Sequence, residues 1–97
     1  MAKYVFIYTG GQMQESPEAQ EASMQAWGEF LGGLGDSVTD MGNPFGTSTI
    51  VGGSGAGNAG GYSIIEADGL EDAAAKTAGC PVLADGGTVE VYEAIAM

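Results

Sequence analysis

The sequence contains no histidine, one cysteine and only two basic residues, and each shortage removes a class of function. Without histidine the chain lacks the usual base at neutral pH, the usual partner of a nucleophilic serine and a common zinc ligand. The single cysteine, Cys80, forms no internal disulfide and completes no structural zinc site. We expect Cys80 to be a small core residue beside a turn at Pro81, in a reducing compartment.

The shortage of basic residues bears on the partners of the chain. Lys3 and Lys76 stand against thirteen acidic residues, which gives a net charge of −11. This charge repels phosphate backbones and anionic lipids, so we expect neither nucleic acid nor a membrane as a partner. No run approaches the roughly 20 apolar residues that span a bilayer, and the first residues show no signal-peptide pattern. We therefore expect a cytoplasmic protein.

The first predicted strand, residues 4–9, has apolar side chains on both faces. Tyr4, Phe6 and Tyr8 share one face, and Val5 and Ile7 share the other. The 97 residues suffice for one domain, residues 1–97, with a thin core, and eighteen glycines add to the entropy lost on folding. Because two helices cover only one face of a small sheet, we expect the other face to meet a second copy of the chain.

The remaining chain alternates helical and extended patterns. A helix is predicted from the Ser16 cap to the glycines at 32–35, and a second helix from Asp68 to Gly79, with Asp68 and Glu71 as its capping box. Extended segments are predicted at 37–41, 48–51, 60–68 and 87–95, with an open register at 36–51. This order predicts an α+β, ferredoxin-like β-α-β-β-α-β sandwich, with a four-stranded antiparallel sheet and two helices on one face.

Residues 55–60 match the pattern G-x-G-x-x-G of dinucleotide-binding proteins. That pattern requires a helix after its last glycine, whereas a strand begins here near Tyr62. We therefore interpret residues 52–61 as a flexible hairpin tip and predict no cofactor. The acidic residues Asp68, Glu71 and Asp72 are explained by helix capping, and we predict no metal site.

Candidate site residues are carboxylates and aromatic side chains. Asp40 lies beside an uncharged turn and is the candidate base if it lies in an apolar pocket, while the alternative is a turn residue in water. Trp27 is a candidate for a ligand pocket or for the core. Aromatic faces favour cations and apolar molecules, so we expect a neutral or cationic organic ligand rather than an anion. The candidate ligand-binding residues are Tyr8, Trp27, Asn43, Phe45 and Tyr62.

Several segments together form a recognisable pattern: residues 4–8, Ser16-Pro17-Glu18, Trp27-Gly28, residues 60–65, Gly79-Cys80-Pro81 and residues 87–91. In these segments the chain resembles the YCII-related family of small bacterial proteins, especially its DGPF-type branch. The resemblance implies a dimeric α+β barrel, in which two ferredoxin-like sheets pack face to face. Some members of the family have a proposed His-Asp pair. This chain lacks histidine and the Asp-Gly-Pro-Phe tetrapeptide, so only Asp40 remains as a candidate for that pocket.

Two functional hypotheses follow, and the sequence leaves open whether the chain is an enzyme. The first is a homodimeric accessory module that binds a small molecule. The second is a histidine-free isomerase- or lyase-like enzyme that uses Asp40 with a tyrosine. A pocket that encloses Asp40 between the first helix and the sheet would favour the enzyme, whereas an exposed Asp40 would leave it without a base.

Overall fold

The computed structural model describes residues 2–10, 16–53, 55 and 57–95. Within them the chain forms β1 (Ala2–Thr9), α1 (Pro17–Leu34), the short 3-10 helix η1 (Gly35–Ser37), β2 (Val38–Asp40), β3 (Ala59–Ala67), α2 (Leu70–Ala75), α3 (Pro81–Ala84) and β4 (Thr88–Ala94). The strands form one antiparallel sheet in the order β2-β3-β1-β4. The prediction of an α+β chain with a four-stranded antiparallel sheet is confirmed, and this strand order is compatible with a ferredoxin-like fold.

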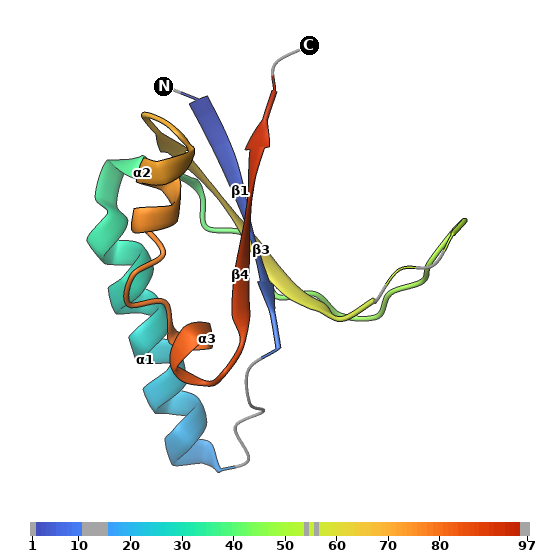
Figure 1. The fold of residues 1–97 in the computed structure, drawn as a ribbon. Coiled ribbons are helices and arrows are strands. Elements are labelled where there is room, and N and C mark those ends of the chain that lie inside the picture. The colour runs from blue at the N-terminus through green and yellow to red at the C-terminus, as the bar shows by residue number, and fades with distance from the viewer. Residues whose placement is uncertain (1, 11–15, 54, 56, 96–97) are drawn as a thin grey trace.

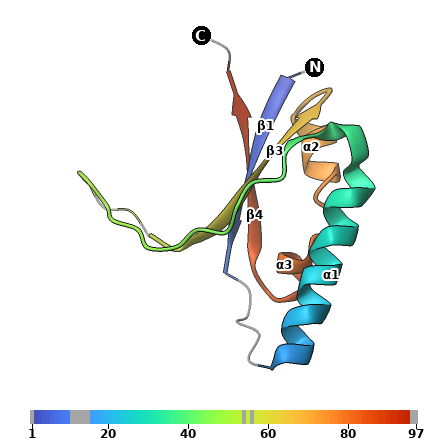
Figure 2. The same cartoon turned by 180° about the vertical axis from the view of Figure 1, so that it is seen from behind.

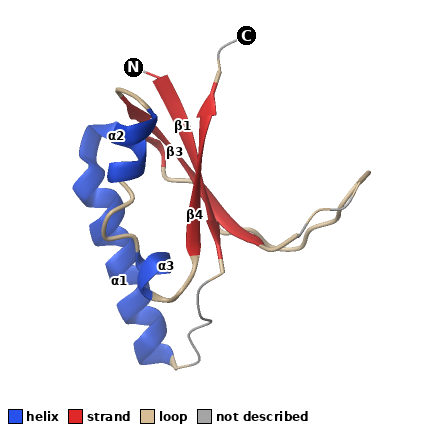
Figure 3. Cartoon of the chain, viewed as in Figure 1, coloured by secondary structure: helices blue, strands red, loops and turns tan. Residues whose placement is uncertain are grey.

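The helices lie together on one side of the sheet (Figure 1, Figure 3). In the part of the chain that the structure describes, the opposite side of the sheet carries no helix. The described residues of the connection between β2 and β3 extend away from that opposite side as a long arm, residues 45–53, 55, 57 and 58, which is also visible from behind in Figure 2. The prediction that the helices cover one face of the sheet is therefore confirmed.

Helix α1 begins and ends where the sequence predicts. The Ser16 side chain accepts a hydrogen bond of 3.0 Å from the backbone N–H of Ala19, and Pro17 occupies the first turn, where its missing N–H costs no hydrogen bond. Gly35 ends the helix with φ +57°, a value that favours glycine, and its N–H donates to the carbonyl of Gly32. These local signals are sufficient to define both ends of α1.

The expected strand at residues 48–51 is not formed. This segment lies in the arm, where Val51 is 91% exposed and no neighbouring strand accepts its backbone. Strand β3 begins at Ala59, close to the predicted start of the extended segment 60–68, so Gly60 and Gly61 belong to the strand rather than to the predicted flexible tip at 52–61. Those glycines are held because Gly61 pairs with Tyr8 and bridges to Pro44. Residues 54 and 56 of the expected tip lie outside the described residues.

The second predicted helix is shorter than expected and is followed by another. Helix α2 ends at Ala75, and its cap residue is Gly69, whose position makes no side-chain capping bond. The backbone N–H of Asp68 donates to the Asp72 carboxylate at 3.0 Å, so Asp72 rather than Glu71 reaches back over the first turn. Pro81 does more than stop a helix, because it opens α3, where proline lacks only a donor that a first turn leaves unused.

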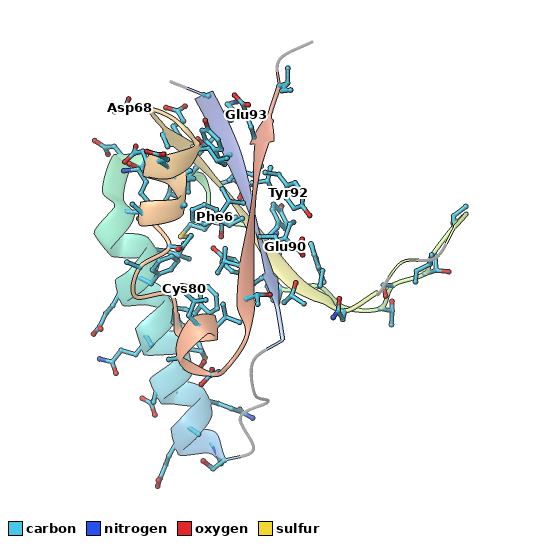
Figure 4. The ribbon with its side chains drawn as sticks, viewed as in Figure 1. Phe6, Asp68, Cys80, Glu90, Tyr92 and Glu93 are labelled. Carbon is cyan, nitrogen blue, oxygen red and sulfur yellow. The ribbon has the colours of Figure 1, made fainter. Side chains whose placement is uncertain are left out.

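The core lies between the sheet and the helices. Phe6 and Cys80 both lie in this layer in Figure 4, and Cys80 is 2% exposed, which confirms its predicted core position. The buried apolar residues are Tyr4, Phe6, Tyr8, Phe30, Ile65, Ala67, Ala73, Cys80 and Val82. The buried polar residue among those described is Ser63, on the same face of β3 as Ile65. A hydroxyl in that position requires hydrogen-bond partners, and these partners lead to the candidate site.

Candidate functional site

A cavity of about 550 Å³ opens between α1, the sheet and the segment that follows β2. Helix α1 contributes side chains at a spacing of three to four residues, which places them on the face that looks toward the sheet. The sheet contributes Tyr8 from β1 and residues 60–63 from β3. The described lining residues are Tyr8, Gly10, Ser23, Met24, Trp27, Leu31, Met41, Gly42, Asn43, Pro44, Gly60, Gly61, Tyr62, Ser63 and Val82.

Trp27 is both a cavity residue and a packing residue. Its ring meets Tyr8 edge to face, with the ring centroids 4.8 Å apart, and also meets Phe30 at 6.0 Å. Such contacts stabilise the wall by about 0.5–1.5 kcal/mol per pair beyond the area they bury. The two roles that the sequence left open for Trp27 are therefore combined, because one edge packs on the core while the side chain is only half-buried and lines the cavity.

A chain of hydrogen bonds crosses the cavity wall. The phenol of Tyr8 donates to Ser63 Oγ at 2.8 Å, and the Ser63 hydroxyl donates to the backbone carbonyl of Met41 at 2.7 Å. Burial raises the pKa of Tyr8, an effect that the Ser63 hydrogen bond partly offsets. The phenol therefore stays protonated at neutral pH, and the chain links β1, β3 and the segment after β2 without any charge.

The wall formed by residues 40–44 depends on a tight turn. The carboxylate of Asp40 accepts a 2.8 Å hydrogen bond from the N–H of Gly42, and Gly42 has φ +77°. A Cβ atom on Gly42 would lie 1.6 Å from the carbonyl oxygen of Tyr62, so the turn lies directly against β3. The N–H of Tyr62 donates to the carbonyl of Asn43, and that of Phe45 to the carbonyl of Gly60. This turn presents the Met41 carbonyl to Ser63.

Four of the five predicted ligand-binding residues line the cavity. The fifth, Phe45, and the predicted base, Asp40, lie outside it. Tyr8, Trp27, Asn43 and Tyr62 line it. Phe45 stacks on the Tyr62 ring, with centroids 5.7 Å apart, and borders a separate hollow of about 530 Å³ beside the arm. Asp40 is exposed and does not line the cavity, contrary to the position that a catalytic base would require.

Sequence reasoning did not identify Ser63 and Met41 as site residues. Ser63 could have been recognised, because it alternates with Ile65 in a strand and therefore points to the same buried face, where a hydroxyl needs a partner. No comparable signal exists for Met41. Its contribution is a backbone carbonyl, whose direction depends on the turn at Gly42 rather than on the side chain.

The described lining of the cavity contains no aspartate, glutamate or lysine. Its ionisable side chain is the phenol of Tyr8, and the remaining wall is apolar, amide, hydroxyl or backbone. Tyr62 alternates with Ser63 along β3, so its ring lies on the opposite face of the sheet, where it stacks on Phe45. Among the described residues, no group of three or more acidic residues or cysteines is arranged to hold a metal ion. The arrangement can therefore enclose an uncharged molecule and make hydrogen bonds to it, but it offers no cationic partner to an anion.

Two further observations concern the chain as a whole. No helix in the described residues is both long and apolar enough to cross a membrane. A scan against protein-family models, a search of curated proteins and a search of solved structures each found no match to this chain.

Proposed function

We propose that the chain is a homodimeric module that binds a small organic molecule, uncharged or cationic, in the cavity between α1 and the sheet. One observation carries this proposal: a cavity of about 550 Å³ whose described lining includes Tyr8 and Trp27 and contains no charged side chain. Its volume falls within the range of about 300–1,000 Å³ typical of small-molecule sites. A carboxylate or phosphate would lose its hydration here without a compensating charge, which favours other ligands.

The position of Asp40 weighs against the alternative of an isomerase or lyase. Its carboxylate lies in solvent and accepts the N–H of Gly42, so it stabilises the turn rather than facing a substrate. The raised pKa of Tyr8 makes its phenol a poor base at neutral pH. A binding or accessory role does not require Asp40 or Tyr8 to act as a base. It agrees with a described cavity lining that contains no charged side chain.

The proposed dimer rests on the helix-free face of the sheet. We define this face by Val5, Ile7, Tyr62, Ile64 and Tyr92, which pair across β3, β1 and β4 in the register Ile64–Val5–Tyr92 and Tyr62–Ile7–Glu90. Figure 4 shows Tyr92 and Glu90 on the side of the sheet away from Phe6 and Cys80. Tyr92 is 53% exposed, and no described helix covers the face. A second copy would cover this apolar surface and form a dimeric α+β barrel of two ferredoxin-like sheets.

The same arrangement is what membership of the YCII-related family would require. The motif residues that suggest the family occupy structural positions here: residues 4–8 form the central strand β1, and Gly79-Cys80-Pro81 leads into α3. Family membership is thus part of the proposal and gives no activity by itself.

A thermal-shift screen of neutral, cationic and anionic metabolites tests the binding proposal. A ligand at a hundred times its dissociation constant should raise the free energy of unfolding by about 2.7 kcal/mol. We expect neutral or cationic aromatic compounds to stabilise the wild type. Trp27→Ala should abolish the effect, whereas Phe45→Ala, which removes an aromatic ring outside this cavity, should retain it. Stabilisation confined to phosphorylated or carboxylated compounds would contradict the proposal.

Sedimentation equilibrium tests the dimer. Ile64→Glu places a charge in the middle of the helix-free face and should shift the protein toward the 9.7 kDa monomer. Leu70→Glu introduces the same charge at a position on α2 that is 57% exposed, and it should leave association unchanged. A wild type that is monomeric at micromolar concentration would refute this part of the proposal.

A further inference from the structure

The hydrogen-bond chain in the cavity wall runs in one direction only. The backbone carbonyl of Met41 has no hydrogen to give, so the 2.7 Å contact with Ser63 requires the Ser63 hydroxyl to be the donor. Ser63 has then used its one hydrogen, and the 2.8 Å contact with Tyr8 requires the phenol to donate. Both distances are normal for hydroxyl hydrogen bonds. The directions follow without any choice of hydrogen positions.

This direction leaves the Tyr8 oxygen with lone pairs only. Its single hydrogen is committed to Ser63, while Tyr8 is one of the residues that line the cavity and its ring contacts Trp27. Tyrosine in water both donates and accepts, but here the donor function is already in use. A ligand group that meets this oxygen forms a hydrogen bond only if it brings an N–H or O–H of its own.

We propose that the cavity selects uncharged aromatic molecules that carry a hydrogen-bond donor, with Tyr8 as the acceptor and Ser63 as the residue that sets the direction. This inference rests on the proposed binding function and narrows its ligand class. A molecule with only an acceptor places two lone pairs against each other at Tyr8 and loses the hydration of its acceptor without replacement. Donor and acceptor isosteres of the same size therefore bind with different affinities.

Three bicyclic probes of similar size separate these cases: indole has only an N–H donor, N-methylindole has none, and quinoline has only an acceptor when uncharged. Their dissociation constants are measured by NMR chemical-shift titration, at a pH where quinoline is neutral. One neutral hydrogen bond changes affinity by about three- to tenfold. We expect indole to bind the wild type more tightly than N-methylindole and quinoline by about this factor.

Two variants test whether the preference for indole depends on Tyr8 and Ser63. Tyr8→Phe removes the oxygen while retaining the ring that packs on Trp27, and it should make indole and N-methylindole bind equally. Ser63→Ala frees the Tyr8 hydrogen, and quinoline should then gain affinity relative to indole. Tyr92→Phe is the matched control, because it removes a phenol oxygen from the exposed strand β4, outside the cavity lining, and should leave the wild-type preference intact.

The outcomes distinguish this inference from the function on which it rests. If all three probes bind the wild type equally, or if the preference for indole survives in Tyr8→Phe, the selectivity proposal is wrong while binding in the cavity stands. If none of the probes perturbs the cavity residues, binding of neutral aromatic molecules fails and the selectivity proposal fails with it. Loss of the preference in Tyr8→Phe but not in Tyr92→Phe supports the assignment.

Discussion

Two buried groups, the Cys80 thiol and the Tyr8 phenol, make the folded chain sensitive to alkali. Burial raises the pKa of Cys80 above its ordinary value of 9.0, partly offset by hydrogen bonds from the backbone at Val82 and Leu83. Burial also raises the pKa of Tyr8 above 10.0. In each case the folded state disfavours the anion, so the unfolded chain releases its proton first as the pH rises.

The free energy of unfolding should therefore be independent of these two groups below about pH 9 and should fall above it. Between the unfolded and folded pKa values the unfolded state binds fewer protons, which gives a negative slope with pH. The Cys80 contribution begins near pH 9.0 and that of Tyr8 near pH 10.0. Urea unfolding at a series of pH values measures the slope. Cys80→Ala, although less stable at neutral pH, should show a shallower decline from pH 9; an unchanged slope would contradict this assignment.

Residue positions were predictable from sequence where a regular strand or helix determines them. Cys80 and Trp27 are examples, since burial and helix spacing decide where they lie. Asp40 is different. Val38, two residues earlier, packs against the core, but an irregularity between Val38 and Asp40 shifts the register so that Asp40 pairs with Ile64 rather than with a core-facing residue. A single irregular residue thus moves Asp40 to the opposite face of the sheet, and no local sequence pattern predicts this irregularity.

At the scale of elements, the turn after β2 is the part of the cavity most sensitive to substitution. Gly42→Ala combines a positive φ of +77° with a Cβ position 1.6 Å from the Tyr62 carbonyl oxygen. We expect a loss of at least about 2 kcal/mol in the free energy of unfolding, measured by urea denaturation. Gly28→Ala is the control, because a Cβ there meets nothing within 4 Å and the residue lies inside α1. It should stabilise the chain by about 0.5–1 kcal/mol. Equal effects of the two substitutions would disprove the turn's role.

The longer elements followed from periodicity and caps, while the shorter ones depended on contacts distant in sequence. α1, β1 and β4 lie close to their predicted ranges. Residues 48–51 have the composition of a strand but no partner, and a strand is stable only when its backbone groups are paired. Residues 60–61 were predicted both as the end of the tip and as the start of an extended segment, and Gly61 pairs with Tyr8 of β1 because glycine there permits the close approach of Asn43 and Pro44. Pairing, rather than propensity, decides both cases.

At the scale of the whole molecule, the sheet has a core on one side and, on the other, an apolar patch bordered by Lys3, Glu66 and Glu90. The sequence predicted from the alternation in β1 that helices cover one face, and the helices on one side confirm that part of the prediction. The proposed dimer must bring two chains together although each carries a net charge of −11. Electrostatic repulsion therefore opposes the association that the apolar face favours.

This opposition predicts that the dimer tightens as salt is added. Raising the ionic strength from about 0.01 M to about 0.15 M shortens the Debye length from about 30 Å to about 8 Å and screens repulsion between the chains. Glu90 lies on β4 beside Tyr92, whose hydroxyl donates to its carboxylate at 2.6 Å, so it should contribute directly to the repulsion at the helix-free face.

Glu90→Gln should therefore lower the dissociation constant of the dimer at low salt and weaken its dependence on salt. Glu18→Gln removes the same charge from the first turn of α1, away from the helix-free face, and should have a smaller effect on both quantities. Sedimentation equilibrium across the salt series measures the dissociation constants. A dimer that is tightest at low salt, or that responds equally to both substitutions, would show that the two chains do not associate through the helix-free face.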